Sequence, residues 1–454
     1  MKYPRYPSYK PSGVEWLGEV PTHWDVKRGR FAIRVNPSPE KLHELAESDE
    51  VSFVPMEAVG EYGGLDLERT KPIFEIGSGY TEFEDGDVVV AKITPCFENG
   101  KGALAEKLAN GVAFGTTELH VLRTKEVLDE RYLFYLTISH PYRKLGEAEM
   151  YGAGGQKRVP PEFTKNLRIP LPELGEQQTI ANFLDAQTTR IDTLIEKKHR
   201  LIEKLKEKRA ALITRTVTRG LPPEAAAAAG LDPNPKLKPS GIDWLGDVPE
   251  HWDVLPFTKY LIDKSDYRGA TPEKVPDGIF LVTAKNVRMG YIDYETSQEY
   301  VREEDYKLIM RRGLPKIGDI LFTTEAPLGN IALVDREGVA LAQRIIRFRL
   351  NPDRFNPQFV LFAMMADAFQ SQLMSLSTGS TAEGIKASKL PILRIIAPPL
   401  PEQNIIVRYI SEELRRIDAA LDPAKDAIDK LQEYRSALIT AAVTGKIDVR
   451  GLAA

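Results

Sequence analysis

Basic and amide side chains gather in three short stretches, and these residue types can bind another molecule through hydrogen bonds and charge. Gln156, Lys157 and Arg158 form one cluster, and the other two lie at residues 285–288 and 343–349. Arginine and lysine donate hydrogen bonds to phosphates and to guanine, and amide side chains pair with adenine. The clusters are compatible with nucleic-acid contact, and equally with an ordinary solvated surface.

The third cluster also predicts its own secondary structure. Ile346, Phe348 and Leu350 alternate with Arg347 and Arg349. A period of two places the apolar and the basic side chains on opposite faces of a strand. We therefore expect a strand with one buried face and one wet, basic face.

Motifs that carry catalysis are missing from the sequence. It has no phosphate-binding Gly-x-x-x-x-Gly-Lys-[Ser/Thr] loop, no Gly-x-Gly-x-x-Gly turn, no His-Glu-x-x-His and no Gly-x-Ser-x-Gly. Of the six histidines, only His23 and His251 recur in equivalent positions, each between a proline and a tryptophan, where a packing or hydrogen-bonding role is expected. The single cysteine, Cys96, excludes an internal disulfide and a thiolate metal cluster, and is expected to be a small buried residue. We expect neither catalysis nor a metal site in this chain.

The elements that position these clusters come from a duplication. Residues 11–26 and 239–254 agree at twelve of sixteen positions, and together they contain all four tryptophans, including Trp16 and Trp244. Their offset of 228 is about half of the 454 residues. A repeat this long is not a solenoid unit, so each copy should form its own core.

A second repeated block predicts a long helix in each half. Apolar residues recur at heptad spacing with further leucines and isoleucines beside them, at Leu184, Ile191, Leu205 and Leu212 in the first copy and at Ile410, Ile417, Leu431 and Leu438 in the second. We expect helices of about 38 residues that pack on each other as an antiparallel coiled-coil spacer. Pro423, which stands where the first copy has Lys197, should kink or split the second helix.

The segments between the repeated blocks differ between the halves and look mainly β. Short β-type runs separated by glycine, proline and asparagine occur at 51–54, 87–93, 119–122, 279–283, 319–324 and 344–350. A helix is expected after each group of runs, at 129–139 and at 357–376. The fold class is therefore α+β, without the regular βαβ alternation of a nucleotide-binding fold.

Composition sets the remaining limits. A hydrophobic content of 42% over 454 residues suits two to four globular domains. No apolar run approaches the roughly 18 to 20 residues of a membrane span, and the first residues lack the apolar centre of a signal peptide. We expect a cytoplasmic protein without a membrane contact. The net charge of −4 argues mildly against nucleic acid over the whole chain, but the clustering of basic residues matters more than the sum.

The motifs occur twice in the same order, and with them the chain resembles the specificity subunit of type I restriction-modification enzymes. The block 240–252 with its earlier copy, the Gly-Asp strand starts at Gly86 and Gly318, and the Pro-Leu-Pro-Glu-Gln sequence that ends at Gln403 carry the resemblance. The first half departs slightly from the last motif, because it reads Pro-Leu-Pro-Glu-Leu-Gly-Glu-Gln up to Gln177. The resemblance covers nearly the whole chain.

The resemblance implies two mainly-β target recognition domains of similar fold, joined by two long antiparallel helices with internal pseudo-two-fold symmetry. The expected parts are recognition domain 1 at 1–176, spacer helix 1 at 177–220, a linker at 221–238, recognition domain 2 at 239–401, spacer helix 2 at 402–446 and a tail at 447–454. The implied partners are double-stranded DNA, two methyltransferase subunits and, through them, restriction and translocase subunits. S-adenosylmethionine, Mg²⁺ and ATP are expected on those partners and none of them on this chain.

Under this reading the polar loops should contact bases and phosphates. The candidates are Lys92, Thr94, Asn99, Lys101, Gln156, Lys157 and Arg158 in the first half, and Lys285, Asn286, Arg288, Asn330, Gln343, Arg344 and Arg347 in the second. The eight heptad residues are expected to pack between the helices or to dock a partner. Three alternatives stay open: a specificity subunit of a type II system with a bipartite site, a duplicated scaffold that binds no DNA, and an enzyme with one active site per half. The last would need matching polar groups in the variable regions, where the halves differ most.

Overall fold

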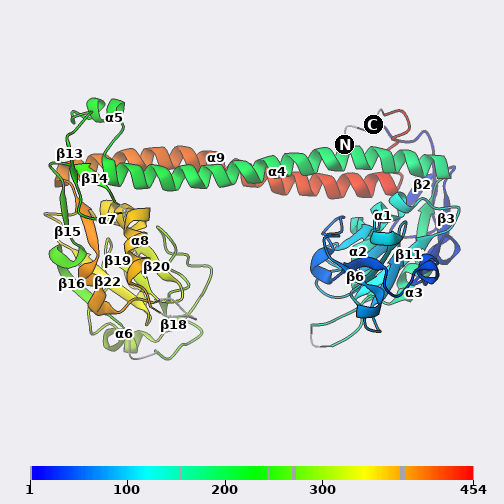
Figure 1. The fold of residues 1–454 in the computed structure, drawn as a ribbon, viewed down its shortest axis with the longest axis horizontal. Helices are drawn as coiled ribbons and strands as arrows, with labels where there is room; N and C mark the ends of the chain where they lie inside the picture. The colour runs from blue at the N-terminus through cyan, green and yellow to red at the C-terminus, as the bar shows by residue number, and fades with distance from the viewer. Residues whose placement is uncertain (1–2, 154, 244, 268–271, 379–383, 453–454) are drawn as a thin grey trace. The chain divides into compact units, whose positions relative to one another are not determined.

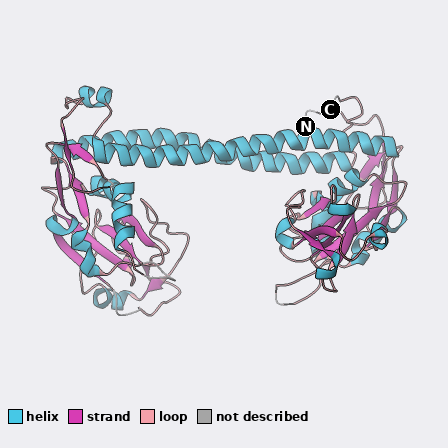
Figure 2. Ribbon diagram, in the orientation of Figure 1, coloured by secondary structure: helices cyan, strands magenta, loops and turns pink. Residues whose placement is uncertain are grey.

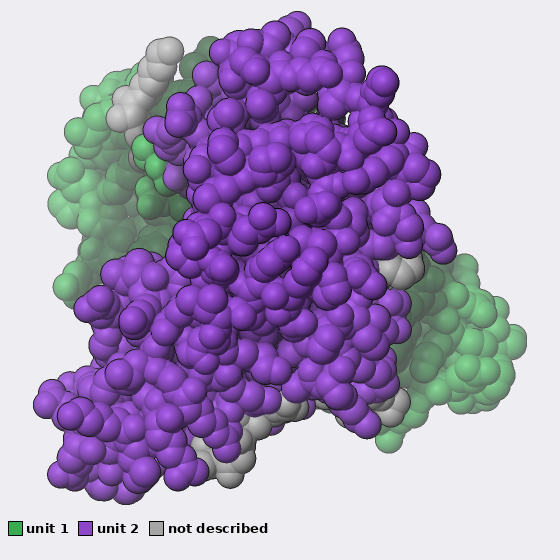
Figure 3. All heavy atoms as spheres, turned by 90° about the vertical axis from the view of Figure 1, so that its left-hand side faces the viewer, with its two compact units in different colours: residues 1–199, 425–454 green, residues 200–424 purple. Residues whose placement is uncertain are grey.

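The chain folds into two compact units, seen here in a computed structural model that describes residues 3–153, 155–243, 245–267, 272–378 and 384–452. Unit 1 contains residues 1–199 and 425–454, and unit 2 contains residues 200–424 (Figure 3). Trp244 of the repeated block lies outside the described residues. Each unit has one tryptophan block, one variable region and part of both long helices (Figure 1).

Unit 1 is built on two four-stranded sheets (Figure 2). One has the strand order β4-β11-β8-β9 and is antiparallel, and the other has the order β6-β5-β10-β7 with β5 and β10 parallel. Two-stranded pairs β1-β2 and β12-β3 complete the unit. The strands are β1 Tyr9–Pro11, β2 Glu19–Pro21, β3 Asp25–Arg28, β4 Ile33–Val35, β5 Glu50–Val54, β6 Thr70–Pro72, β7 Thr81–Glu84, β8 Val88–Ala91, β9 Gly102–Leu104, β10 Val112–Gly115, β11 Leu119–Thr124 and β12 Arg168–Leu171.

Unit 2 repeats this plan with different sequences. Its antiparallel sheet has the order β16-β22-β19-β20, its second sheet is β18-β17-β21 with β17 and β21 parallel, and the pairs are β13-β14 and β15-β23. The strands are β13 Leu237–Pro239, β14 Asp247–Pro249, β15 Asp253–Pro256, β16 Leu261–Asp266, β17 Ile279–Val282, β18 Tyr300–Val301, β19 Ile320–Thr324, β20 Leu328–Leu333, β21 Ala340–Leu341, β22 Ile345–Leu350 and β23 Arg394–Ala397. The predicted α+β class with two mainly-β domains of similar fold is confirmed.

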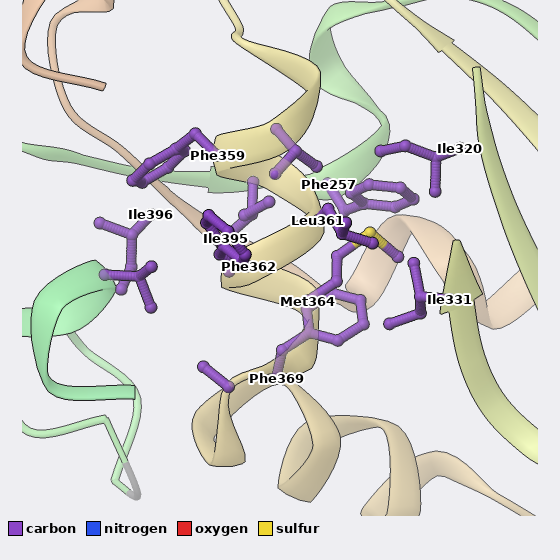
Figure 4. Close-up of a cluster of buried hydrophobic side chains, with 14 of the residues drawn as sticks. Phe257, Ile320, Ile331, Phe359, Leu361, Phe362, Met364, Phe369, Ile395 and Ile396 are labelled. Carbon is purple, nitrogen blue, oxygen red and sulfur yellow. The ribbon is translucent and has the colours of Figure 1, made fainter. Parts of the chain in front are cut away.

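The shorter helices are α1 Glu130–Ile138, α2 His140–Ala148, α3 Pro161–Asn166, α5 Pro223–Ala228, α6 Glu303–Ile309, α7 Pro357–Met365 and α8 Asp367–Leu376. The single helix predicted at 357–376 is wrong, because Ala366 is extended and a bend of 65° separates α7 from α8. The bend brings Phe359 of α7 and Phe369 of α8 into one apolar core, in which six of the nine α7 residues are buried (Figure 4). In the described part of the chain no single helix is long and apolar enough to cross a membrane, although α7 and α8 together meet that test of length and composition.

The two long helices are α4 Leu174–Arg219, with 46 residues, and α9 Leu400–Val443, with 44. Both exceed the predicted 38 residues because they begin early: α9 begins inside the Pro-Leu-Pro motif, and α4 begins at Leu174, two residues after it. The prediction that Pro423 splits α9 is wrong, since the helix runs through it unbroken. Pro423 is exposed and its neighbours Leu421 and Ala424 are buried, so packing is kept and water can reach the carbonyl that loses its amide partner.

Within each unit the helices pack on each other. In unit 1, Leu184 and Ile191 near the start of α4 share a core with Leu438 near the end of α9, so the helices are antiparallel there. In unit 2, Ile213 near the end of α4 shares a core with Ile410 near the start of α9. An ion pair crosses the helices in each unit, from Arg435 to Asp192 at 3.3 Å and from Arg209 to Asp418 at 3.0 Å.

The repeated residues at the start of each long helix form the same contacts in both units. Glu176 accepts from Trp24 Nε1 at 3.1 Å and lies 2.8 Å from His23 Nε2, and Glu402 makes the same contacts with Trp252 and His251 at 3.1 and 2.8 Å. Both tryptophans are fully buried. The predicted hydrogen-bonding role of the two histidines is therefore confirmed, and each tryptophan block is fixed to the start of a long helix.

Gln177 and Gln403, one residue further on, bind the variable regions through backbone atoms. Gln177 donates to Val127 O and Pro172 O at 2.9 and 2.8 Å and accepts from Asp129 N at 2.9 Å. Gln403 makes the corresponding bonds to Arg354 O, Pro398 O and Asn356 N at 2.9, 2.8 and 2.9 Å. The constant blocks thus position each variable region on the helices.

Candidate DNA interface

The aspartate of each Gly-Asp strand start anchors the central sheet. Asp87 accepts two hydrogen bonds from Arg123, at 2.7 and 2.8 Å, and Asp319 accepts two from Arg349, at 2.8 and 2.7 Å. Bidentate pairs of this kind combine charge with fixed geometry. Both aspartates are almost fully buried, so these pairs hold strands together and leave little of either carboxylate for a ligand.

The sequence predicts that the basic face of the 344–350 strand is exposed to solvent. This prediction is wrong at Arg347, which is fully buried. Its guanidinium donates to Asp319 at 2.9 Å, to Ser265 at 2.6 Å and to Asp263. Burial acts to lower the pKa of Arg347, but the hydrogen bonds to Asp263 and Asp319 outweigh it and the pKa is raised. The alternation was read correctly, but carboxylates from other strands cover the basic face, so Arg347 is a structural residue.

In the first half, two polar segments that contain predicted DNA contacts lie against each other. Thr94 N and Thr94 Oγ1 both donate to Lys157 O, at 3.0 and 3.2 Å, and Val159 N donates to Lys92 O at 2.8 Å. Lys157 and its neighbour Gln156 are exposed. The loop after β8 and the segment 156–158 therefore form one surface, which we call the first candidate surface: Lys92, Thr94, Gln156, Lys157 and Arg158.

Two side chains of this surface are only partly available to a ligand. Arg158 binds Glu118 through two hydrogen bonds of 2.8 and 2.7 Å, and this bonding lowers the pKa of Glu118. Burial lowers the pKa of Lys92. Binding a phosphate through Arg158 would require exchange with Glu118.

The other two first-half candidates lie further along the same loop and face residues 56–62. Asn99 Nδ2 donates to Glu61 at 3.3 Å, and Lys101 Nζ donates to Met56 O at 3.0 Å. Asn99 is exposed and Lys101 is half-buried. They belong to the loop that carries Lys92 and Thr94, but their present partners are protein atoms.

His120 on β11 is hydrogen-bonded to Val159, the residue that follows Arg158 of the first candidate surface. Its Nε2 donates to Val159 O at 2.8 Å, and its Nδ1 accepts from Asn36 Nδ2 at 3.4 Å. Asn36 Oδ1 accepts from Val121 N, which fixes the amide and makes the imidazole the neutral Nε2–H form. Burial lowers the pKa of His120, in agreement with a neutral ring.

In the second half, the predicted DNA contact Asn286 does not reach the surface. Asn286 is fully buried and its side chain bonds Thr283, Asp293 O and Ser297 O, so it closes a turn. The amide of Asn330 likewise donates to Val287 O at 2.8 Å. Both amides satisfy backbone groups that the loop would otherwise leave unpaired.

The remaining second-half candidates lie at or near the surface. Lys285 and Arg344 are exposed, and Arg344 forms an ion pair with Glu325 at 3.1 Å. Arg288 donates to Thr296 at 3.0 Å and is half-buried, as is Gln343. We define the second candidate surface as Lys285, Arg288, Gln343 and Arg344.

Sequence reasoning missed an exposed aromatic residue near each surface. Tyr151 is 62% exposed and its backbone pairs with Arg158, while Tyr291 is 59% exposed and its carbonyl accepts from Arg288 N. Exposed rings can stack on bases or pack against sugars. The sequence signal that could have identified Tyr151 is an aromatic residue close to glycines and basic residues, as in segment 150–158.

The heptad residues divide into a buried and a half-buried group. Leu184, Ile191, Ile410, Ile417 and Leu438 are buried, whereas Leu205, Leu212 and Leu431 are half-buried. Leu194 and Leu201, two turns apart on one face of α4, are 40% and 41% exposed. The apolar stripe is thus wider than the seam between the helices.

Two β domains of one plan, each fixed to a long helix by the same Glu-Gln pair and each with a different polar loop surface, define a duplicated recognition module. A sequence profile for the type I restriction modification DNA specificity domain matches residues 37–204 and 290–420, and the chain belongs to that family.

Individual relatives agree with this assignment. The specificity subunit of the type I restriction enzyme EcoAI from Escherichia coli is 39% identical over 164 residues, which cover 36% of this chain and 27% of that protein. The MjaVIII specificity subunit from Methanocaldococcus jannaschii is 25% identical over 345 residues, 74% of this chain and 75% of that protein. The match therefore spans about a quarter of the E. coli relative and three quarters of the archaeal one.

Solved structures share the fold. A chain from a type I restriction-modification system, described for its complex assembly and conformational transition, superimposes with a TM-score of 0.66 at 17% identity, over 93% of this chain and 98% of the other. The HsdS subunit from Thermoanaerobacter tengcongensis gives 0.51, also at 17% identity, over 94% and 98%.

Proposed function

We propose that this chain is the DNA sequence-specificity subunit of a type I restriction-modification complex. In this function each variable domain reads one half of an asymmetric, bipartite DNA site, and the chain itself catalyses nothing. The observation that carries the proposal is the pairing of one repeated frame with two unlike loop surfaces. A repeated frame can present two different reading surfaces to two half-sites on one duplex.

Reading would combine phosphate and base contacts. Lys157 and Lys285 are exposed cations suited to phosphates, and their loss should weaken binding to all sequences. Gln156 and Gln343 are the amides best placed to read adenine, and replacing a base reader should cost about 1 to 3 kcal/mol at one position of the site.

We further propose that two methyltransferase subunits dock on the long helices and link the chain to restriction and translocase subunits. S-adenosylmethionine, Mg²⁺ and ATP would bind to those partners, and the complex would act in the cytoplasm, where its DNA is. Leu194 of unit 1 supports a docking role, because an exposed leucine on a helix gains free energy when a partner helix covers it. Leu194→Glu should reduce co-elution with the methyltransferase without lowering the unfolding midpoint of the free chain. Unchanged co-elution would exclude this face as the dock.

The experiment that tests the main proposal maps methylated adenines across the genome of a host that carries this chain and its methyltransferase. We expect one motif of two unlike blocks, of about three to five bases each, separated by a fixed gap of unspecified bases. Exchanging residues 27–167 for another variable region should change one block and leave the other intact. A continuous or palindromic motif, or a change in both blocks, would contradict the proposal.

A control separates recognition from catalysis. The purified chain without its methyltransferase should methylate no adenine, and methylation by the chain alone would show that it is an enzyme. Cleavage on both sides of the site by the complete complex would identify a type II system in place of type I.

A further inference from the structure

Tyr62 lies in the loop 60–64, next to the loop 95–101, which we call the first recognition loop, and it contacts a long helix of unit 1. Two guanidinium groups contact its ring, with Arg143 Cζ at 4.7 Å and Arg435 Cζ at 5.1 Å from the ring centroid. Arg143 Nη2 donates to Tyr62 Oη at 2.8 Å, and Arg435 Nη2 donates to Tyr62 O at 3.2 Å. Arg143 belongs to α2 and Arg435 to α9, so one side chain joins three parts of the unit.

The loop held by Tyr62 is bonded to the loop that carries candidate DNA contacts. Tyr62 N donates to Gly100 O at 2.9 Å, and Glu61 pairs with Lys101 as an isolated bridge. Asn99 donates to the Glu61 carboxylate. Hydrogen bonds therefore connect residues 60–64 with 95–101, and we expect a displacement of Tyr62 to displace Asn99 and Lys101.

Loop 95–101 has two attachments near the helices. Phe97 is buried in the apolar core of unit 1 beside Tyr142 of α2, whereas Asn99 and Lys101 are attached through residues 61 and 62. A cleft of about 760 Å³ opens beside Tyr62, lined by that residue, Asn99, Asp192 and Arg435 among others. Gly63 approaches Phe134 of α1 closely, but Arg143 Nε and Nη1 are buried and have no hydrogen-bond partner in the described structure. In the described residues, the Arg143 guanidinium thus contacts the Tyr62 ring and donates its hydrogen bond to Tyr62 Oη.

The backbone of Tyr62 indicates that this arrangement is imposed by its surroundings. Its φ of +61° lies in the left-handed region, which a tyrosine rarely adopts because its Cβ is crowded there. Such a conformation persists where neighbouring contacts over-determine it. Here those contacts are the two arginines and Gly100.

The second unit keeps the frame, but among its described residues no aromatic ring contacts Arg209 in the way that Tyr62 contacts Arg435. Arg209 occupies the position equivalent to Arg435 and pairs with Asp418 as Arg435 pairs with Asp192. Gln370 on α8 stands where the first half has Arg143, and its amide donates to Gly329 O and Met364 O. Arg435 and Arg209 each form an ion pair between the long helices, but only Arg435 contacts Tyr62. Comparing substitutions at these two positions therefore distinguishes the effect of the ion pair from the effect of the Tyr62 contact.

We propose that Tyr62 is a positioning residue for DNA recognition: held by Arg143 and Arg435, it fixes Asn99 and Lys101 of loop 95–101 relative to the helices and thereby the spacing at which the first half-site is read. This inference rests on the proposed function. Tyr62 itself need not touch DNA. A looser contact would let the first recognition loop accept half-sites displaced along the duplex.

The test compares Arg435→Ala with Arg209→Ala in the assembled complex of the chain with its methyltransferase. Fluorescence anisotropy would give Kd for the mapped site and for the same site with its gap lengthened by one base pair. We expect Arg435→Ala to reduce the preference for the correct gap by about tenfold, as expected for the loss of a desolvated cation–π contact with its hydrogen bond. Arg209→Ala should keep the preference of the unaltered chain, because it loses only an ion pair.

Two variants of Tyr62 distinguish positioning from simple stability. Tyr62→Phe keeps the ring that the arginines contact and should retain most of the gap preference, whereas Tyr62→Ala should lose it like Arg435→Ala. If Arg435→Ala does not assemble, Arg435→Lys keeps the charge for Asp192 but loses the planar stacking, and should lose the preference too.

The outcomes separate the two proposals. If the unaltered complex does not distinguish the two gaps, the proposed function fails. If it distinguishes them and Arg435→Ala behaves like Arg209→Ala, the function stands and the positioning role of Tyr62 is refuted.

Discussion

Replacing Arg347 by alanine should damage the stability of unit 2 and should not act first on DNA binding. The side chain is fully buried and makes charge-assisted hydrogen bonds to Asp319, Asp263 and Ser265. Removing one partner of a buried ion pair typically costs about 3 to 5 kcal/mol. The lower end applies here, since Arg349 still binds Asp319 through two hydrogen bonds and the Asp263 side chain is 40% exposed. We therefore expect a loss of about 3 kcal/mol.

The assay is thermal unfolding followed by circular dichroism, with Arg344→Ala as the matched control three positions earlier. A loss of about 3 kcal/mol should lower the transition of a unit of this size by roughly 6 to 12 °C. Arg344 is exposed and paired with Glu325 on the surface, so its replacement should cost about 1 kcal/mol or less. Arg347→Met keeps much of the buried volume and should fall between the two.

The refuting result is specific. If Arg347→Ala leaves the unit 2 transition within about 1 °C of the unaltered chain but weakens DNA binding at the second half-site, then Arg347 reaches the DNA and the sequence-based assignment was right. Weaker binding that accompanies the expected loss of stability is instead a consequence of unfolding.

Gln177→Ala and Gln403→Ala should each cost roughly 2 to 4 kcal/mol, because each removes the side-chain partner of three backbone groups, of which two are buried for Gln177 and one for Gln403. Chemical denaturation should show the loss in unit 1 and in unit 2 respectively. His120 has a folded-state pKa below its unfolded value of about 6.5, so its contribution to stability is full above that pH and declines as the pH falls below it. Unfolding at pH 7.5 and at pH 5.5 should show this decline, and His120→Gln, which can still donate to Val159 O, should reduce it; equal decline in both proteins would assign it to other groups. Leu184→Ala should cost about 2 to 5 kcal/mol, whereas Leu194→Ala, at an exposed position of the same helix, should change the free energy of unfolding by about 0.5 kcal/mol or less, and similar losses would contradict the assigned helix seam.

The fold was predictable wherever the sequence repeats itself or has a clear period. The heptads at Leu184 and Ile410 led to the long helices, and the repeated tryptophan block led to two units. The break at Ala366 was not predictable, because the apolar sequence of α7 and α8 suits one buried helix as well as two. The intact helix at Pro423 was missed because a local penalty was given more weight than packing on both sides of it.

The candidate interface was harder to predict because residue type does not reveal what covers a side chain. The alternation around Arg347 fixes which residues share a face, but Asp263 and Asp319, distant in sequence, decide that this face is closed. Asn286 carries donors that suit adenine, yet the turn around it uses those donors for its own backbone. The polar residues of a loop are therefore candidates for DNA contact. Those that are buried because they stabilise the loop are no longer candidates.

The contacts between the repeated frame and the variable regions explain why two unlike domains can share one frame. Gln177 and Gln403 bind their domains mainly through backbone groups, such as Val127 O in the first half and Arg354 O in the second. Backbone amides and carbonyls are present whatever side chains a domain carries, so these bonds place no demand on the sequence of the reading loops. Tyr62 and Arg143 differ in this respect, because their contact depends on side chains that the second half lacks. An exchanged first domain would therefore keep the bonds to Gln177 but would keep the contact with Arg435 only if it also supplied an aromatic residue at the position of Tyr62.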